Sequence, residues 1–257
     1  MHPELAHFYE ICEALERGQI RVAEPIDGQW TVHSEIKTAI LAGFKHGVLQ
    51  DMSQGGFSFW DKDTFPVRKF TENDQVRIVP GGTSIRRGAY LAPGVIVMPP
   101  AYINVGAYVD SGTLIDSHAL VGSCAQIGKR VHLSAGAQIG GVLEPVGARP
   151  VILEDEVFVG GNAGIFEGVH VQKGAVIATG VILNGSTAVY DATTGELLRA
   201  DDQGCLKIPP YAVVVAGSRP ICHGKGSEDG IQLYTPVIIK YRDGKTDQAL
   251  TMEDWLR

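Results

Sequence analysis

An aliphatic residue recurs at every sixth position through the middle of the chain, and this period distinguishes strand from helix. At about 100° per residue, positions six apart rotate by about 240° around a helix, whereas at about 180° per residue they share one face of a strand. A first run consists of Ile85, Leu91, Val97, Ile103, Val109, Ile115, Val121, Ile127, Leu133 and Ile139. A second run consists of Leu153, Val159, Ile165, Val171, Ile177 and Leu183. These sixteen positions predict short strands that bury one aliphatic side chain each.

A small or β-branched residue follows each aliphatic residue by four positions, as at Ala89, Ala107 and Thr113, with Leu143 as the bulky exception. Gly, Asn or Asp separates the units, and these residues turn the chain at low steric cost. One such strand cannot bury its own aliphatic residue, so the units must stack, with layers about 4.8 Å apart. The sequence therefore predicts a parallel solenoid.

This pattern resembles the hexapeptide-repeat acyltransferases, and the resemblance implies the hand of the solenoid. In that superfamily three six-residue units form one turn of a left-handed parallel β-helix, an exception to the usual right-handed crossover. Sixteen units make about five turns. We therefore predict an all-β solenoid with a small N-terminal helical domain and a short C-terminal β cap. The expected divisions are an N-terminal α/β substrate-binding region over 1–80, the β-helix over 81–217 and the cap over 218–257.

The flanks of the repeat predict the elements that cover its ends. One helix is expected over 4–17, with Leu5, Phe8, Cys12 and Leu15 on one face, and another over 34–46. A turn at Asp27 and Gly28 separates them, one or two strands should follow residue 230, and a short helix is expected at the end of the chain.

Two breaks in the repeat predict excursions from the solenoid. From Ile139 to Leu153 the spacing is 14 residues, two more than two repeats, and the segment 144–150 (EPVGARP) is rich in turn residues. We expect an extruded loop there. After Leu183 the period fades through residues 190–207 and resumes at Val213–Gly217, which predicts a second excursion or a lost coil.

Composition excludes several classes of protein. The formal net charge is −7, and no long basic run is present, which argues against a nucleic-acid or anionic-membrane surface. No stretch of about 18 apolar residues is present, so no bilayer span is expected. The four cysteines have no C-x-x-C spacing and the start has no signal-peptide layout, so we expect reduced thiols and a cytoplasmic location.

Several strings narrow the resemblance to the tetrahydrodipicolinate N-succinyltransferase family. They are Arg21–Glu24 (RVAE), Ile26–Trp30 (IDGQW), Arg77–Pro80 (RIVP), Gly106–Asp110 (GAYVD), Val121–Lys129 (VGSCAQIGK), Val131–Ser134 (VHLS) and Gly140–Pro145 (GGVLEP). The resemblance covers about residues 18–217. It implies transfer of a succinyl group from succinyl-CoA to the amino group of ring-opened tetrahydrodipicolinate (L-2-amino-6-oxopimelate) in diaminopimelate and lysine biosynthesis. It also implies a homotrimer with sites between subunits.

The resemblance gives Asp116 a catalytic and substrate-binding role and Arg77 a substrate-binding role. Glu167 is the second candidate catalytic residue, as an aid to proton transfer. An arginine fork suits bidentate binding of the acceptor's carboxylates. From the residues alone, Asp116 is equally explained as a corner aspartate, Arg77 as a surface arginine and Glu167 as a solvated acid in a turn. Arg86 and Arg87 are weaker candidates for carboxylate binding.

Two departures from the family pattern concern the chemistry. His118 stands where family members commonly have Trp, and it raises the alternative of a histidine general base. Gly164 stands where the family has a glutamate proposed as catalytic, in a stretch that commonly reads ARSEVVEG. Either Glu167 or another group replaces that glutamate, or its role is dispensable.

The expected CoA site lies on late coils, with Ala178 and Ala216 leaving room for the pantetheine arm. Arg219 and Lys225 are the expected phosphate ligands, with Lys240 as a further cation. His118, His132 and His170 are not separated by multiples of the 18-residue turn, so no metal site and no permanent cofactor are assigned.

Two other functions remain open from sequence alone. One is a related CoA-dependent N-acyltransferase with a changed donor, acetyl-CoA, or a changed amine substrate. The other is a non-catalytic hexapeptide-repeat scaffold, against which the retained Asp116 and Arg77 argue.

Overall fold

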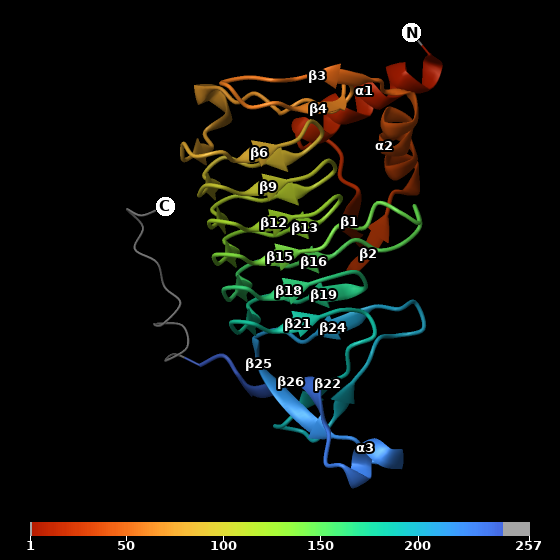
Figure 1. Cartoon of the computed structure of the whole chain (residues 1–257), viewed down its shortest axis with the longest axis vertical. Helices are drawn as coiled ribbons and strands as arrows, with labels where there is room; N and C mark the ends of the chain where they lie inside the picture. The colour runs from red at the N-terminus through yellow and green to blue at the C-terminus, as the bar shows by residue number, and fades with distance from the viewer. Residues whose placement is uncertain (1, 244–257) are drawn as a thin grey trace.

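The computed structural model describes residues 2–243, and its body is a stack of β-strand layers (Figure 1). Each layer contains one strand from each of three sheets, and the chain visits the sheets in turn. We name the sheets by their first strands. The β6 sheet contains β6 (Ser84–Ile85), β9 (Tyr102–Ile103), β12 (Leu120–Val121), β15 (Gln138–Ile139), β18 (Gly164–Ile165) and β21 (Ile182–Leu183). The β7 sheet contains β7 (Tyr90–Leu91), β10 (Tyr108–Val109), β13 (Gln126–Ile127), β16 (Ile152–Leu153), β19 (Val169–Val171) and β24 (Leu206–Ile208).

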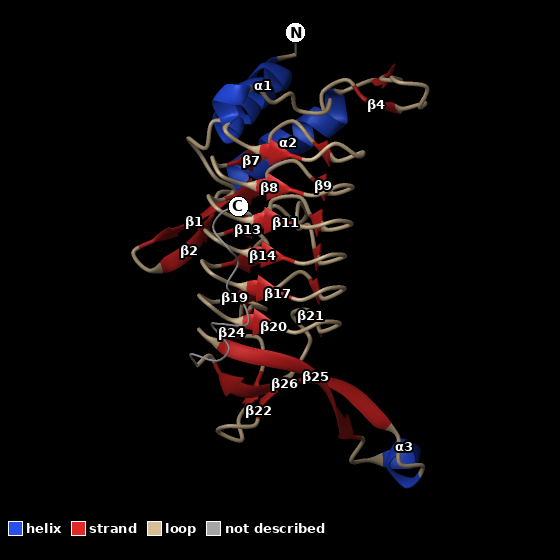
Figure 2. Ribbon diagram, turned by 90° about the vertical axis from the view of Figure 1, so that its left-hand side faces the viewer, coloured by secondary structure: helices blue, strands red, loops and turns tan. Residues whose placement is uncertain are grey.

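The β5 sheet extends beyond the stack. Its parallel part contains β5 (Arg77–Ile78), β8 (Ile96–Val97), β11 (Leu114–Ile115), β14 (His132–Leu133), β17 (Phe158–Val159), β20 (Val176–Ile177) and the start of β25 (Ala212–Pro220). It continues with β26 (Gln232–Tyr241), β22 (Val189–Asp191) and β23 (Leu197–Leu198). β26 runs antiparallel to β25, and the two form a ribbon that ends at α3 (Gly224–Glu228), away from the stack (Figure 2).

The six-residue repeat sets the register of the stack. From β5 to β18, each strand pairs in parallel with the strand three further along the chain, as when Ile115 lies beside Leu133. β19 and β20 pair instead with β24 and β25, because the second excursion lies between. All sixteen predicted aliphatic positions are at most 2% exposed, and they form the interior of the stack. The prediction of short parallel strands that share one buried face is therefore confirmed.

The two predicted excursions are present, and both interrupt passage from the β6 sheet to the β7 sheet. Residues 140–151 join β15 directly to β16 and contain no strand. The spacing from Ile139 to Leu153 is 14 residues, which is eight more than the six residues between neighbouring strands of the regular repeat. We call this segment the extruded loop. Residues 184–205, which we call the second excursion, join β21 to β24 and contribute β22 and β23 to the cap.

The N-terminal segment covers the first layers and the β7 sheet. The two predicted helices are confirmed as α1 (Pro3–Glu16) and α2 (Ser34–His46), which pack through Phe8, Cys12 and Ile40. Between them, β1 (Ala23–Ile26) and β2 (Gln29–Val32) form a hairpin around the predicted turn. A second hairpin consists of β3 (Leu49–Asp51) and β4 (Trp60–Lys62), and the short helix η1 (Glu72–Asp74) precedes β5.

The expected domain boundaries fall inside continuous structure. β5 already belongs to the stack before residue 81, and β25 runs across residue 217 into the cap. The cap is thus an extension of the β5 sheet, because β25 supplies both its last parallel strand and its first antiparallel one. Between residue 230 and residue 243 the structure contains one strand, β26, and the helix expected at the chain end lies outside the described residues.

The four cysteines carry free thiols. Cys12, Cys124 and Cys205 are buried, whereas Cys222 is exposed. Within residues 2–243, no helix combines the length and the apolar character that crossing a membrane requires.

Candidate active site

Asp116 lies on the edge where strands of the β5 sheet lead into the β6 sheet, which we call the β5/β6 edge. It directly follows β11. The strand registers place Ser134, Gly160 and Ala178 at the equivalent positions of the next three layers. These small residues form a strip along the edge, so the predicted Asp116 and Ala178 lie on the same edge, three layers apart. The next equivalent position is Val215 in β25. The predicted Ala216 is the residue after it, and it is exposed.

The Asp116 carboxylate is half-buried, and one oxygen is already bound locally. The backbone N–H of Ser117 donates to Oδ1 at 2.7 Å. Asp110 makes the same bond with Ser111, also at 2.7 Å, on another edge. The bond is thus a recurring corner feature of this fold. Among residues 2–243 no hydrogen-bond partner is found for the second oxygen of Asp116, which remains available to a ligand.

His118 and Arg77 occupy the same region of the stack. His118 is an exposed corner residue with φ of 62°, and its backbone N–H donates to the Pro100 carbonyl at 2.6 Å. Arg77 is on β5, two layers before β11 on the same sheet, and its side chain is exposed. Both residues therefore lie near the predicted strip, on its side of the molecule.

Glu167 lies on a different edge from Asp116, so one chain does not bring the two predicted catalytic residues together. It follows β18 where the β6 sheet leads into the β7 sheet, at what we call the β6/β7 edge. There it lines a pocket of about 390 Å³ between the extruded loop and the second excursion. Arg149 of the extruded loop lines the same pocket, and sequence reasoning did not single it out.

Gly164 leaves no room for the family's glutamate. A Cβ atom at this buried position would lie 2.6 Å from the Phe166 ring and 3.0 Å from Ile182. A larger side chain at residue 164 would therefore have to displace Phe166. The two alternatives from the sequence therefore both stand: Glu167 or another group takes the place of that glutamate, or its role is dispensable.

The expected phosphate ligands are dispersed along the cap. Arg219 is exposed on the β25–β26 ribbon, opposite Leu233. Lys225 lies in α3 at the end of the ribbon (Figure 2), and its ammonium is 3.1 Å from both Glu228 and Asp229. These hydrogen bonds raise the pKa of Lys225. Lys240 pairs with Asp243 at 3.2 Å. The two lysines are thus partnered within the chain, and Lys225 does not lie beside the strip of Asp116 and Ala178.

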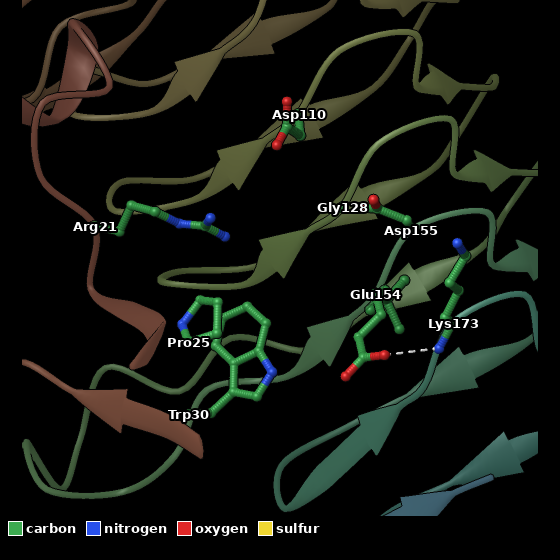
Figure 3. A pocket seen from close by; sticks show the side chains of 9 residues that line it. Arg21, Pro25, Trp30, Asp110, Gly128, Glu154, Asp155 and Lys173 are labelled. Carbon is green, nitrogen blue, oxygen red and sulfur yellow. Dashed lines mark hydrogen bonds between the residues drawn. The ribbon is translucent and has the colours of Figure 1, made fainter. Parts of the chain in front are cut away.

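A second pocket, of about 250 Å³, marks the seam between the β1–β2 hairpin and the stack (Figure 3). Arg21 stacks on Tyr108 at 3.7 Å and donates to Gln126 Oε1 at 3.0 Å, and burial lowers its pKa. Glu154 accepts from His170 at 2.7 Å and from the backbone N–H of Lys173 at 2.8 Å. Trp30 packs edge-on against the His170 ring at 6.0 Å, so Arg21 of RVAE and Trp30 of IDGQW both attach the hairpin to the β7 sheet.

The histidines predicted not to align are indeed apart: His132 is on the β5 sheet and His170 on the β7 sheet. Sequence reasoning did not consider another group, in which ligand atoms of His2, Glu4 and His46 lie within 4.8 Å of one another. Glu4 also contacts Lys45 at 3.5 Å. This largely exposed cluster joins the start of α1 to the end of α2.

Comparisons with known proteins agree on one family. Residues 4–45 match a model of the tetrahydrodipicolinate N-succinyltransferase N-terminal region, and residues 150–184 match the hexapeptide repeat of succinyl-transferase. The 2,3,4,5-tetrahydropyridine-2,6-dicarboxylate N-succinyltransferase of Legionella pneumophila (strain Corby) is 47% identical, over 96% of this chain and 87% of the relative. The enzyme of the same name from Acinetobacter baylyi is 44% identical, over 96% and 88%.

A solved structure supports the fold. The crystal structure of a 2,3,4,5-tetrahydropyridine-2-carboxylate N-succinyltransferase from Campylobacter jejuni aligns with a TM-score of 0.50 at 16% identity, over 96% of this chain and 64% of that one. With sequence identity this high to the curated relatives, over nearly their whole length, the chain belongs to the tetrahydrodipicolinate N-succinyltransferase family.

Proposed function

We propose that the chain transfers the succinyl group of succinyl-CoA to the amino group of ring-opened tetrahydrodipicolinate, in the diaminopimelate and lysine pathway. The names of the relatives support the reaction, and the strip of small residues beside Asp116 is the observation that supports its location. The three steps from Asp116 to Ala178 correspond to about 14 Å, at about 4.8 Å a layer. An extended pantetheine arm fits along such a strip, because no large side chain interrupts it.

The proposed chemistry is an acyl transfer. The acceptor nitrogen attacks the thioester carbonyl, a C–N bond forms, the C–S bond breaks, and CoA leaves as its thiol. Once the nitrogen has attacked, it becomes acidic and must pass a proton to a base before the thiol leaves. Asp116 is our candidate for that base, because one of its oxygens remains available while Ser117 holds the other.

The positions of Asp116 and Glu167 support a site shared between copies. The two carboxylates are on different edges of one stack, so they can act together only if the edges of two copies meet. We propose a homotrimer, in which each β5/β6 edge faces the β6/β7 edge of a neighbour. We also propose that the stack is left-handed, as in hexapeptide-repeat proteins, and that the enzyme is cytoplasmic, with CoA thioesters as cosubstrates and no permanent cofactor.

The test is release of CoA with tetrahydrodipicolinate as acceptor, comparing succinyl-CoA with acetyl-CoA. We expect kcat/KM for succinyl-CoA to be higher by about tenfold or more, because the succinyl group carries a free carboxylate for recognition and the acetyl group does not. Preference for acetyl-CoA would replace the donor in this proposal. Absence of CoA release with either donor would overturn the proposed reaction. Light scattering should report about three times 27.5 kDa.

A further inference from the structure

The pocket at the β6/β7 edge is built by the two excursions and floored by backbone. Gly168, which follows β18, and Gly185 and Gly204, at the two ends of the second excursion, line it. A Cβ atom at Gly168, whose φ is 73°, would lie 2.5 Å from the Gly204 carbonyl and 3.1 Å from the Gly185 Cα. The glycines thus let three backbone segments approach closely and keep the floor free of side chains.

Arg149 and Glu167 supply opposite charges to this pocket, and neither side chain forms an ion pair within residues 2–243. The Arg149 guanidinium donates to the neutral Gln203 Oε1 at 3.3 Å. Asp201 of the second excursion is near enough for the charge of Arg149 to contribute to its lowered pKa, but within residues 2–243 no carboxylate lies within ion-pair distance of Arg149. Within the same residues we find no hydrogen bond or ion pair for the Glu167 carboxylate. Charged groups that line a pocket without charged partners are available to a ligand.

Arg149 is held in place by its neighbour in the extruded loop. The fully buried Lys37 of α2 donates from Nζ to the Ala148 carbonyl at 2.6 Å, and burial lowers the pKa of Lys37. Ala148 itself packs against the core, and Pro150 is buried. The loop is therefore anchored on both sides of Arg149, which limits the entropy lost when its guanidinium binds a ligand.

We propose that this pocket binds the 2-amino carboxylate end of the acceptor, with the carboxylate on Arg149 and the amino group on Glu167. The inference rests on the proposed function, because it places the nitrogen that is acylated. A zwitterionic end matches one unpaired cation and one unpaired anion. A carboxylic acid without the amino group would leave the Glu167 carboxylate without a partner, and an amine without the carboxylate would leave the Arg149 guanidinium without one. The pocket therefore selects α-amino acids over either.

The first experiment measures binding to the full chain by calorimetry, with L-2-aminopimelate and pimelate as probes. We expect wild type to bind 2-aminopimelate more tightly than pimelate. Arg149→Met should weaken the binding of 2-aminopimelate by about 30-fold or more. Arg149→Lys should weaken it by less, because lysine keeps the positive charge but cannot bind a carboxylate through two parallel N–H donors. The matched control is Arg199→Met, since Arg199 is an exposed arginine of the second excursion that does not line the pocket. It should bind like wild type.

The second experiment compares Michaelis constants in the CoA-release assay. Arg149→Met should raise KM for tetrahydrodipicolinate and leave KM for succinyl-CoA within about twofold. If wild type releases CoA but Arg149→Met changes acceptor binding and KM by less than about twofold, the inference is overturned. Equal increases for both substrates also overturn it. Should Arg149→Met fail to fold, the same criteria apply to Arg149→Lys.

These measurements separate the inference from the function on which it rests. Wild type that releases no CoA, yet binds 2-aminopimelate in a manner that depends on Arg149, supports the pocket and rejects the reaction. Glu167→Gln supplies an independent check on the other charge. It should reduce the preference for 2-aminopimelate over pimelate, and an unchanged preference would contradict the role assigned to Glu167.

Discussion

Two pockets on different edges of one stack differ in whether their charged side chains have partners within the protein. At the hairpin seam, Glu154 accepts from His170 and from a backbone N–H, and Arg21 stacks on Tyr108 while donating to Gln126. At the β6/β7 edge, within the described part of the chain, neither Arg149 nor Glu167 forms an ion pair. Partnered charges of this kind attach one part of the protein to another. Unpartnered ones in a pocket indicate a ligand.

The largest effect should follow from placing an unpartnered charge where no ligand or solvent can reach it. Val121 is fully buried inside the stack. Val121→Asp should yield no soluble folded protein, because an unpaired buried carboxylate costs several kcal/mol. Val121→Ala, which leaves only a cavity, should fold with a lower melting temperature. A soluble Val121→Asp protein that melts normally would show that the register is wrong.

The next largest effect concerns the β5/β6 edge. Asp116→Asn should lower turnover by about 100-fold without changing the melting temperature, because the amide keeps the corner bond but cannot accept the proton. Asp110→Asn is the matched control, since Asp110 makes the same corner bond elsewhere. Its turnover should stay near wild type. Equal turnover in the two variants would reduce Asp116 to a corner residue, leaving His118 or Glu167 as the candidate base.

At the seam, a substitution should affect stability and leave catalysis unchanged. Arg21→Met removes the contacts with Tyr108 and Gln126 and leaves a buried amide oxygen without its donor. We expect a loss of about 1–3 kcal/mol in the free energy of unfolding, measured by urea titration. Both Michaelis constants should be unchanged. Arg17→Met, which removes an exposed pair with Glu13, should cost about 0.5 kcal/mol or less. A large change in acceptor KM for Arg21→Met would remove the distinction between the pockets.

The smallest effect depends on pH. Burial alone would raise the pKa of Glu154, but hydrogen bonds from His170 and Lys173 outweigh it and the pKa is lowered. The ionised form therefore stabilises the fold above the ordinary carboxyl pKa, and this stabilisation is lost as the pH falls through the lowered value. The difference in melting temperature between wild type and Glu154→Gln should shrink from pH 7 towards pH 4. A difference that grows on acidification would contradict this sign.

The sequence predicted the stack because its information is local and repeated. Each aliphatic residue specifies its own strand, so the register followed from spacing alone. Glu167 could have been placed by the same arithmetic. Gly160 lies two layers beyond Asp116 on the same edge, because two turns of 18 residues plus the eight residues added in the extruded loop separate them in sequence. Glu167 comes after the next strand, β18, and therefore lies on the next edge.

The pocket at the β6/β7 edge could not be predicted in this way. Arg149 meets Gln203, which is 54 positions away in a different excursion. Neither excursion follows the repeat, so no periodicity relates them. The anchor of the loop comes from Lys37, 111 positions from Ala148 in sequence. Contacts of this kind depend on tertiary packing, which the repeat does not encode.

The distribution of the cysteines determines how the transfer reaction can be followed. A thiol reagent that detects released CoA also reacts with accessible protein thiolates. Burial raises the pKa of both Cys12 and Cys124 to about 12, and Cys205 is buried. Cys222 is exposed, and it alone of the four offers its sulfur to the reagent in the folded protein. Cys222→Ser should therefore give a silent background, against which each reagent molecule consumed reports one acyl group transferred.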